Sequence, residues 1–158
     1  MNDDIARIIE RLSGERCERK EVGRMKSLSL GFGDSAHRRT VKGNDRVYRA
    51  WELGTYRSAW RIVRGGVVLC GSQDAADANK LNTVLRGIEL GRFVALRQPT
   101  LLDIRVELDN DVEVDFFVAT SDDDECFHIF CPDNLHVEFS MRRGWKTGRS
   151  DEPWDTQR

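Results

Sequence analysis

Two runs of alternating apolar and polar residues, separated by Asp109-Asn110-Asp111, constrain this fold more than any other feature. The apolar positions of the two runs are Leu102, Ile104, Val106 and Leu108, then Val112, Val114, Phe116 and Val118. A period of two is typical of strands that bury one face. The pattern therefore predicts an antiparallel hairpin in which the apolar sets face each other and Arg105 lies opposite Asp115.

Similar signals predict strands along most of the chain. They cover residues 17–22, 27–32, 46–53, 58–64, 67–70, 92–98, 126–131 and 135–140. Gly65-Gly66 suits a two-residue hairpin turn, because both positions tolerate positive φ, and Pro132-Asp133-Asn134 joins the last two strands. Residues 33–45 are polar and rich in turn formers, so we expect a long loop there.

Two helices are expected. Asn2 can cap the first, whose apolar stripe is Ile5, Ile8, Ile9 and Leu12. The second begins near Asp74, and its stripe is Ala78, Leu81, Leu85 and Ile88. Each helix precedes a series of antiparallel strands, and this repeated order suggests an internal duplication. We therefore predict an α+β fold of two pseudo-repeated helix-plus-antiparallel-strand units packed as one domain.

The domain organisation follows from this pattern. Residues 1–140 are expected to form a single domain, with pseudo-repeats at about 3–72 and 73–140. Residues 141–158 contain glycine, proline and charged residues, and we expect an irregular C-terminal tail.

Several short motifs carry a family resemblance. They are Leu12, Gly14, Phe32-Gly33, Trp60-Arg61-Ile62, Gly71-Ser72-Gln73-Asp74 and Leu108-Asp109-Asn110. On these motifs the chain resembles a loosely defined group of small, uncharacterised bacterial two-half α+β proteins. Some members are taken for immunity or defence-associated proteins. Phe127 stands where the group would have tryptophan, and no catalytic residue comes with the resemblance.

Charge is distributed unevenly along the chain. Residues 1–50 hold 12 Lys/Arg and 8 Asp/Glu, whereas residues 101–158 hold 6 and 15, a net charge of −9. The acidic and aromatic positions expected to form one surface are Glu107, Asp109, Asp111, Glu113, Asp115, Phe117, Asp122, Asp123, Asp124 and Glu125. An acidic surface edged by aromatic rings suits a basic protein partner and repels nucleic acid. Ordinary solubility explains the same charges equally well.

No motif for catalysis or for a cofactor is convincing. Gly31–Ala36 fits a dinucleotide fingerprint, but no amphipathic helix follows it. The aspartates around Asp111 imitate a calcium loop without its glycine. Cys126 and His128 are expected on one face of a strand, with Glu138 of the next strand opposite His128, but such strand positions give a nucleophile poor reach. We therefore predict a protein that is not an enzyme, with no catalytic residue, no metal ligand and no cofactor.

The function predicted from the sequence is binding. The sharpest hypothesis is an immunity-type protein that covers a basic toxin with its acidic C-terminal half. One alternative is a small-ligand-binding protein or enzyme with a site between the halves, using Trp60, Arg61 or His128. Another is a homodimer formed by edge strands or the tail. The start of the chain lacks signal-peptide features and no apolar run could span a membrane, so the expected compartment is the cytoplasm.

Overall fold

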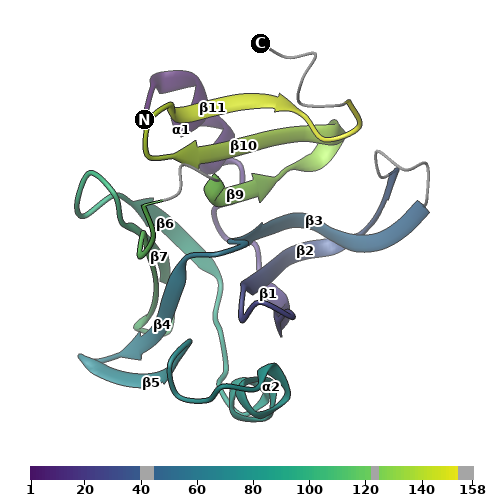
Figure 1. Ribbon diagram of the computed structural model, residues 1–158. Helices are drawn as coiled ribbons and strands as arrows, with labels where there is room; N and C mark the ends of the chain where they lie inside the picture. Colours follow the sequence, from purple (N-terminus) through teal and green to yellow (C-terminus); the bar gives the residue numbers. More distant parts are fainter. Residues whose placement is uncertain (40–44, 122–124, 153–158) are drawn as a thin grey trace.

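The computed structural model describes residues 1–39, 45–121 and 125–152, and its architecture is mostly β. Within these residues, eleven strands form two antiparallel sheets, and the only α-helices are two short ones. The larger sheet has the order β1-β2-β3-β9-β10-β11, and the smaller has the order β5-β4-β8-β7-β6 (Figure 1).

The bounds of the strands agree closely with the predicted ones over most of the chain. The larger sheet contains β1 (Cys17–Val22), β2 (Leu28–Arg39), β3 (Asp45–Gly54), β9 (Glu125–Phe130), β10 (Leu135–Ser140) and β11 (Gly144–Arg149). The smaller contains β4 (Ala59–Arg64), β5 (Val67–Gly71), β6 (Phe93–Arg97), β7 (Ile104–Leu108) and β8 (Val112–Phe117). A single 3-10 turn, η1 (Pro132–Asn134), joins β9 to β10.

The registers predicted for the late hairpins are confirmed. Arg105 pairs with Asp115 across β7 and β8, and His128 pairs with Glu138 across β9 and β10. Gly65 and Gly66 both have positive φ, as a two-residue turn between right-twisted strands requires. Alternation fixes register because a slip of one residue would turn the whole apolar set toward solvent.

The core lies between the inner faces of the two sheets. Phe116 of β8 meets Phe127 of β9 with ring centroids 5.0 Å apart, and Phe32 of β2 meets Phe93 of β6 at 6.0 Å. All four rings are buried. Each contact joins one sheet to the other, so burial of these rings holds the two sheets face to face.

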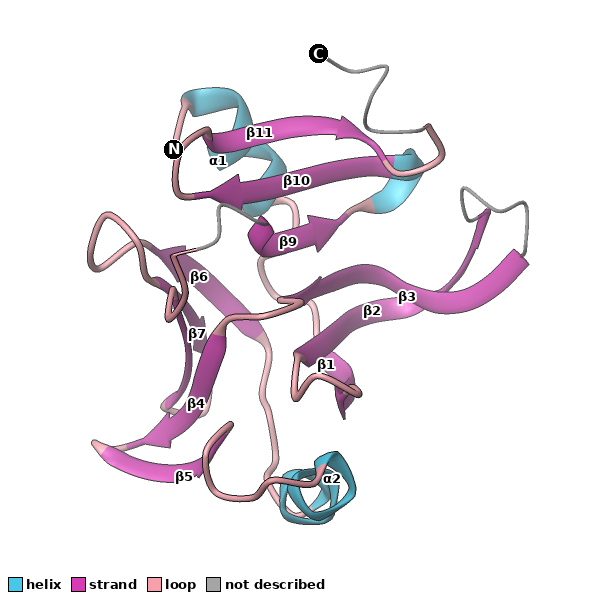
Figure 2. Cartoon of the chain, viewed as in Figure 1, coloured by secondary structure: helices cyan, strands magenta, loops and turns pink. Residues whose placement is uncertain are grey.

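The helices lie where the two sheets have their edges. Helix α1 (Asp3–Glu10) contacts β6 and β11, and α2 (Ala78–Arg86) contacts β1 and β5 (Figure 2). Each helix thus touches an edge strand of both sheets, which shields edges that would otherwise be open to pairing. Within the described ranges, neither helix has the length and apolar character needed to cross a membrane.

The predicted α+β fold of repeated helix-strand units is wrong. The larger sheet combines β1–β3 with β9–β11, and the smaller combines β4–β5 with β6–β8. Each sheet therefore takes strands from both expected repeats. The helices do not form layers on the sheets, because each sheet buries its apolar face against the other sheet. Similar local order in the two halves indicated a duplication that the pairing does not follow.

The long loop predicted at residues 33–45 is also wrong where the structure describes it. Strands β2 and β3 continue as a pair to Arg39 and Asp45. Beyond Phe32 and Trp51 they pair only with each other, and they project from the body of the molecule (Figure 1). With no third strand and no core behind it, this segment needs no alternation of apolar residues, so its sequence resembles a loop.

The tail predicted to be irregular contains an edge strand. β11 pairs with β10 from Gly144 to Arg149, and Trp145 packs on Phe139 with centroids 5.2 Å apart. Its indole Nε1 donates a hydrogen bond to Gln98 Oε1 over 3.2 Å. An edge strand can be held by a single buried apolar side chain, here Trp145. The glycines and charged residues around it therefore gave no strand pattern in the sequence. Residues 153–158 lie outside the described part of the chain.

Candidate functional site

The residues predicted to form one acidic surface are divided among three places. Glu107, Asp109, Asp111 and Glu113 gather at the turn end of the β7–β8 hairpin, which we term the acidic hairpin end. Asp115 and Phe117 lie farther along β8. Glu125 is the first residue of β9, and Asp122, Asp123 and Asp124 lie outside the described residues.

The acidic hairpin end places like charges side by side. Glu107 and Glu113 are direct cross-strand partners, an arrangement that destabilises a hairpin. In the turn between them, Asp109 Oδ1 accepts a hydrogen bond from the backbone N–H of Arg92 over 2.7 Å. Asp111 is exposed and has φ 59°, a conformation that an aspartate tolerates better than most residues.

Two arginines partly offset this charge. Arg97 Nε lies 3.4 Å from Glu107 Oε2, and Arg105 Nη1 lies 3.0 Å from Glu113 Oε2. All four side chains are at least partly exposed, so water screens both pairs. Neither of these two ion pairs involves Asp111. The end therefore keeps an acidic character.

Asp115 does not belong to the exposed surface that was predicted. It is 2% exposed, and its carboxylate accepts hydrogen bonds from Arg61 Nε over 2.8 Å and from Arg105 Nε over 2.7 Å. The hydrogen bond to Asp115 raises the pKa of Arg105 above its ordinary value. Two arginines from the neighbouring strands β4 and β7 thus enclose the carboxylate, because all three residues share the outer face of the smaller sheet. Asp115 stabilises that sheet and is not available to a partner.

Phe117 is also separated from the acidic hairpin end. It lies at the opposite end of β8, and the guanidinium carbon of Arg61 stands 4.9 Å from its ring centroid. A cation over the face of a ring is attracted by the ring quadrupole. Phe117 therefore helps to hold Arg61 toward Asp115, and it is no neighbour of the four acidic residues.

The larger sheet carries a second enclosed carboxylate that the sequence did not reveal. Glu52 is buried, and it accepts hydrogen bonds from Arg19 Nη2 over 2.5 Å and from the backbone N–H of Arg49 over 2.9 Å. A single glutamate in an otherwise ordinary strand gives no sign of this role. The role of Glu52 can be recognised only once β1 and β3 are known to flank β2.

The face of β9 and β10 that bears His128 is occupied by stacked rings. His128 is 6% exposed, and its ring centroid lies 4.6 Å from that of Tyr56 and 5.0 Å from that of Phe130. Phe130 in turn stacks on the buried His136 at 4.6 Å. In the Cys126, His128 and Glu138 arrangement considered from the sequence, the His128 imidazole is therefore packed between aromatic rings.

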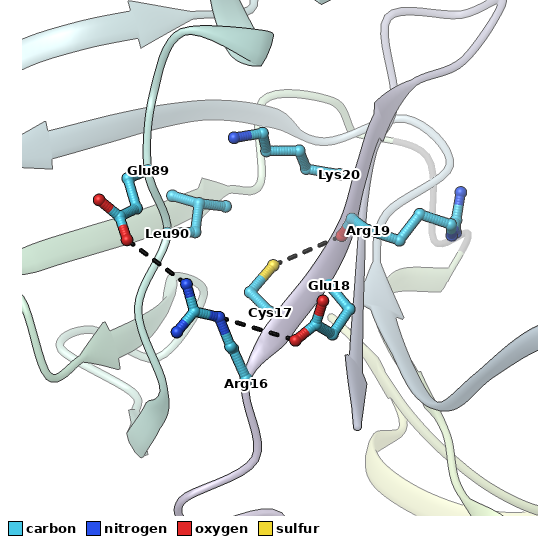
Figure 3. A pocket seen from close by; sticks show the side chains of 7 residues that line it. All are labelled: Arg16, Cys17, Glu18, Arg19, Lys20, Glu89 and Leu90. Atoms are coloured by element: carbon cyan, nitrogen blue, oxygen red, sulfur yellow. Dashed lines mark hydrogen bonds and ion pairs between the residues drawn. The ribbon is translucent and has the colours of Figure 1, made fainter. Parts of the chain in front are cut away.

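A small hollow lies beside β1, where the chain enters the first strand. It has a volume of about 210 Å³ and is lined by Arg16, Cys17, Glu18, Arg19, Lys20, Glu89 and Leu90 (Figure 3). Arg16 sits between Glu18 and Glu89 at 3.6 and 3.5 Å, respectively. Burial raises the pKa of the Cys17 thiol to about 12, so this sulfur is a poor nucleophile at neutral pH.

The hollow offers little to a ligand. Its volume is below the roughly 300–1,000 Å³ of typical ligand sites. The amine of Lys20 donates to the carbonyl of Ile88, and in Figure 3 the head of Arg19 points away from the hollow. Among the described residues, no group of three or more His, Cys, Asp or Glu side chains is placed to hold a metal ion.

Together these observations define a protein of two facing antiparallel sheets whose notable exposed charge cluster is the end of one hairpin. No family model, no curated protein and no solved structure matches the chain. The resemblance to bacterial two-half proteins stays a prediction, and any function has to be argued from the residues themselves.

Proposed function

We propose that this protein acts by binding, and that a basic protein partner docks on the acidic hairpin end. The observation that carries the proposal is the direct pairing of Glu107 with Glu113. Like charges at one cross-strand position lower the stability of the hairpin, and opposite charge from a partner relieves that repulsion. Exposed Asp111 in the adjoining turn extends the same negative surface.

This surface is smaller than the one expected from the sequence. Asp115 is enclosed by Arg61 and Arg105, so its charge is not part of the exposed surface. The partner would therefore meet a compact acidic tip. An immunity-type protein that covers a basic toxin is one form of this proposal.

The test removes charge without reversing it, so that the arginines of the sheet are not repelled. The variant is Glu107→Gln/Asp111→Asn/Glu113→Gln, which leaves Asp109 to accept the hydrogen bond from the Arg92 backbone. The matched control is Glu10→Gln/Glu21→Gln/Glu89→Gln, which removes the same charge elsewhere. Cooperative thermal unfolding of both proteins establishes that each is folded.

The three proteins are used in parallel to capture partners from a lysate of the cells that encode the chain. The proposal predicts a basic protein that the wild type and the control retain and the hairpin variant loses. With that protein purified, calorimetry should give a dissociation constant at least about tenfold weaker for the hairpin variant, since three rim charges contribute about 0.5 kcal/mol each. Equal affinity of the wild type and the hairpin variant for the partner refutes the docking site.

A further inference from the structure

The strand at one margin of the smaller sheet is only partly covered. In the described part of the chain, β5 pairs with β4 alone, and Val67 and Val68 at its start are 63% and 52% exposed. Its last residue, Gly71, is buried, and the Gly71 N–H donates to Asp74 Oδ2 over 2.9 Å. Figure 1 shows β5 running from this exposed start toward the end that leads to α2. We term residues Val67–Leu69 the open edge.

The open edge lacks the charges that protect most edge strands. Proteins place charged residues or proline on an edge because its unpaired backbone N–H and C=O groups otherwise attract another strand. The segment Gly65–Ser72 contains no charged residue and no proline. The other edge strands of the described residues, β1, β6 and β11, each carry an arginine. β1 and β6 also share a shift of register with β5, so charge is what distinguishes β5 from them.

The open edge lies in line with the acidic hairpin end. Val68 pairs with Val63 of β4, Val63 pairs with Glu113 of β8, and Glu113 pairs with Glu107 of β7. Directly paired residues project from the same face of a sheet, so these four side chains form one row on the outer face. Strands lie about 4.8 Å apart, which puts Glu113 about 10 Å from Val68. The row is therefore apolar at the open edge and acidic two strands further in.

We propose that an extended segment of a basic protein pairs with the open edge and adds a strand to the smaller sheet beside β5. The inference rests on the proposed function, and it states which part of the partner reaches the acidic hairpin end. In this mode of recognition, backbone hydrogen bonds to the edge supply affinity and alternate side chains supply specificity. The three residues of the open edge offer about 10 Å of backbone to such a segment.

The charge of the segment follows from the row. The added strand would lie three strand spacings, about 14 Å, from Glu113. A lysine or arginine opposite Val68 can lay its methylene chain across Val68 and Val63 and carry its charge toward Glu113. A second copy of this chain is a poorer occupant, because its own β5 has no basic residue to meet Glu113. An edge of three residues also buries far less than the roughly 1,200 Å² of a stable interface, so the contact with the acidic hairpin end is needed as well.

The experiment uses a fluorescent nonapeptide that alternates lysine with valine, and its anisotropy is measured as the full chain is added. A lysine–proline peptide of the same length and charge is the first control, because proline removes N–H groups and cannot continue a strand. A glutamate–valine peptide is the second. The wild type should bind the lysine–valine peptide at least about tenfold more tightly than either control peptide. At saturation, hydrogen exchange at the amides of residues 67–69 should slow by at least about tenfold.

The edge variant is Val67→Thr/Val68→Thr, which keeps two β-branched side chains and removes their apolar contact. The matched control is Val47→Thr/Val94→Thr, whose valines lie on other strands and are 64% and 50% exposed. Control and wild type should bind the lysine–valine peptide equally. The edge variant should bind it at least about fivefold more weakly, since two methyl groups that contact the added strand become hydroxyls. Cooperative thermal unfolding establishes that each variant is folded.

Several results overturn the proposal. They are no binding by the wild type at about 1 mM protein, equal affinity for the lysine–proline peptide, an equal loss in control and edge variant, and unchanged exchange at residues 67–69. Slow exchange there in the free chain that is lost on dilution also overturns it, because a second copy is then the occupant.

The Glu107→Gln/Asp111→Asn/Glu113→Gln variant separates this inference from the proposed function. It should also bind the lysine–valine peptide more weakly than the wild type. If it does and the edge variant does not, the acidic hairpin end binds without strand pairing and the open edge is no site. If the edge variant alone weakens binding, the acidic docking site is refuted and the open edge stands as a site for an extended segment.

Discussion

Replacement of Asp115 by asparagine tests the account of the smaller sheet most directly. The side chain keeps its size and one oxygen acceptor, but it loses the charge that Arg61 and Arg105 share. Asp115 receives both Nε groups over 2.8 and 2.7 Å, and Arg105 Nη2 adds a third hydrogen bond over 3.2 Å. Asp115→Asn therefore leaves two neighbouring guanidinium groups with no carboxylate between them.

The size of the effect follows from how exposed each partner is. Breaking a fully buried ion pair costs about 3–5 kcal/mol. The side chains of Arg61 and Arg105 are 43% and 29% exposed, so water compensates part of that loss. We therefore expect a loss of about 2–3 kcal/mol in the free energy of unfolding. At about 2–4 °C per kcal/mol for a chain of this size, the Tm should fall by roughly 4–12 °C.

Urea unfolding followed by tryptophan fluorescence measures this loss, and an unchanged m-value shows that the denatured state is unaffected. Glu113→Gln is the control, because its carboxylate also pairs with Arg105 but is 37% exposed. It should cost less than about 1 kcal/mol, as exposed pairs do. If Asp115→Asn costs no more than Glu113→Gln, the enclosed carboxylate does not stabilise the sheet.

Two further predictions concern glycine and cysteine. Gly54→Ala should lower the free energy of unfolding by more than about 2 kcal/mol, because a Cβ there would lie 2.4 Å from the Leu28 carbonyl oxygen. Gly87→Ala, with its nearest atom at 3.5 Å and φ −78°, should be neutral or stabilising in the same thermal melts. The thiol of Cys17 has its pKa raised from 9.0 to about 12, so its contribution to stability is complete below pH 9 and declines between pH 9 and 12. Cys17→Ala should flatten the fall in stability between pH 9 and 12, and an identical pH profile for both proteins would contradict this.

The sequence predicted local structure well because alternation is a local signal. The β7–β8 register and the Gly65-Gly66 turn needed only neighbouring residues, and both are confirmed. The pairing of β3 with β9 joins residues more than 70 positions apart, and no local pattern encodes it. Similar order in the two halves therefore suggested a repeat, whereas apolar contact between sheets determined the fold.

The candidate site shows the same division. Counting charges located the acidic stretch, and the β7–β8 register correctly placed Arg105 opposite Asp115. The sequence could not show that Arg61, which lies 54 residues from Asp115 along the chain, approaches the same carboxylate. Nor could the sequence show that β2 and β3 continue as a pair beyond Phe32 and Trp51, because a two-stranded hairpin with no third strand beside it has the composition of a loop.

The way the larger sheet is assembled has a consequence for synthesis on the ribosome. β3 ends at Gly54 and its neighbour β9 begins at Glu125. The edge of β3 that pairs with β9 therefore stays unpaired until roughly 70 further residues have been synthesised. At about 5–20 residues per second, that edge is open for roughly 4–14 s. A nascent chain that stalls before β9 presents an unfinished strand and the apolar faces of Leu30 and Leu53, and it is then exposed to proteases and to other unfinished chains.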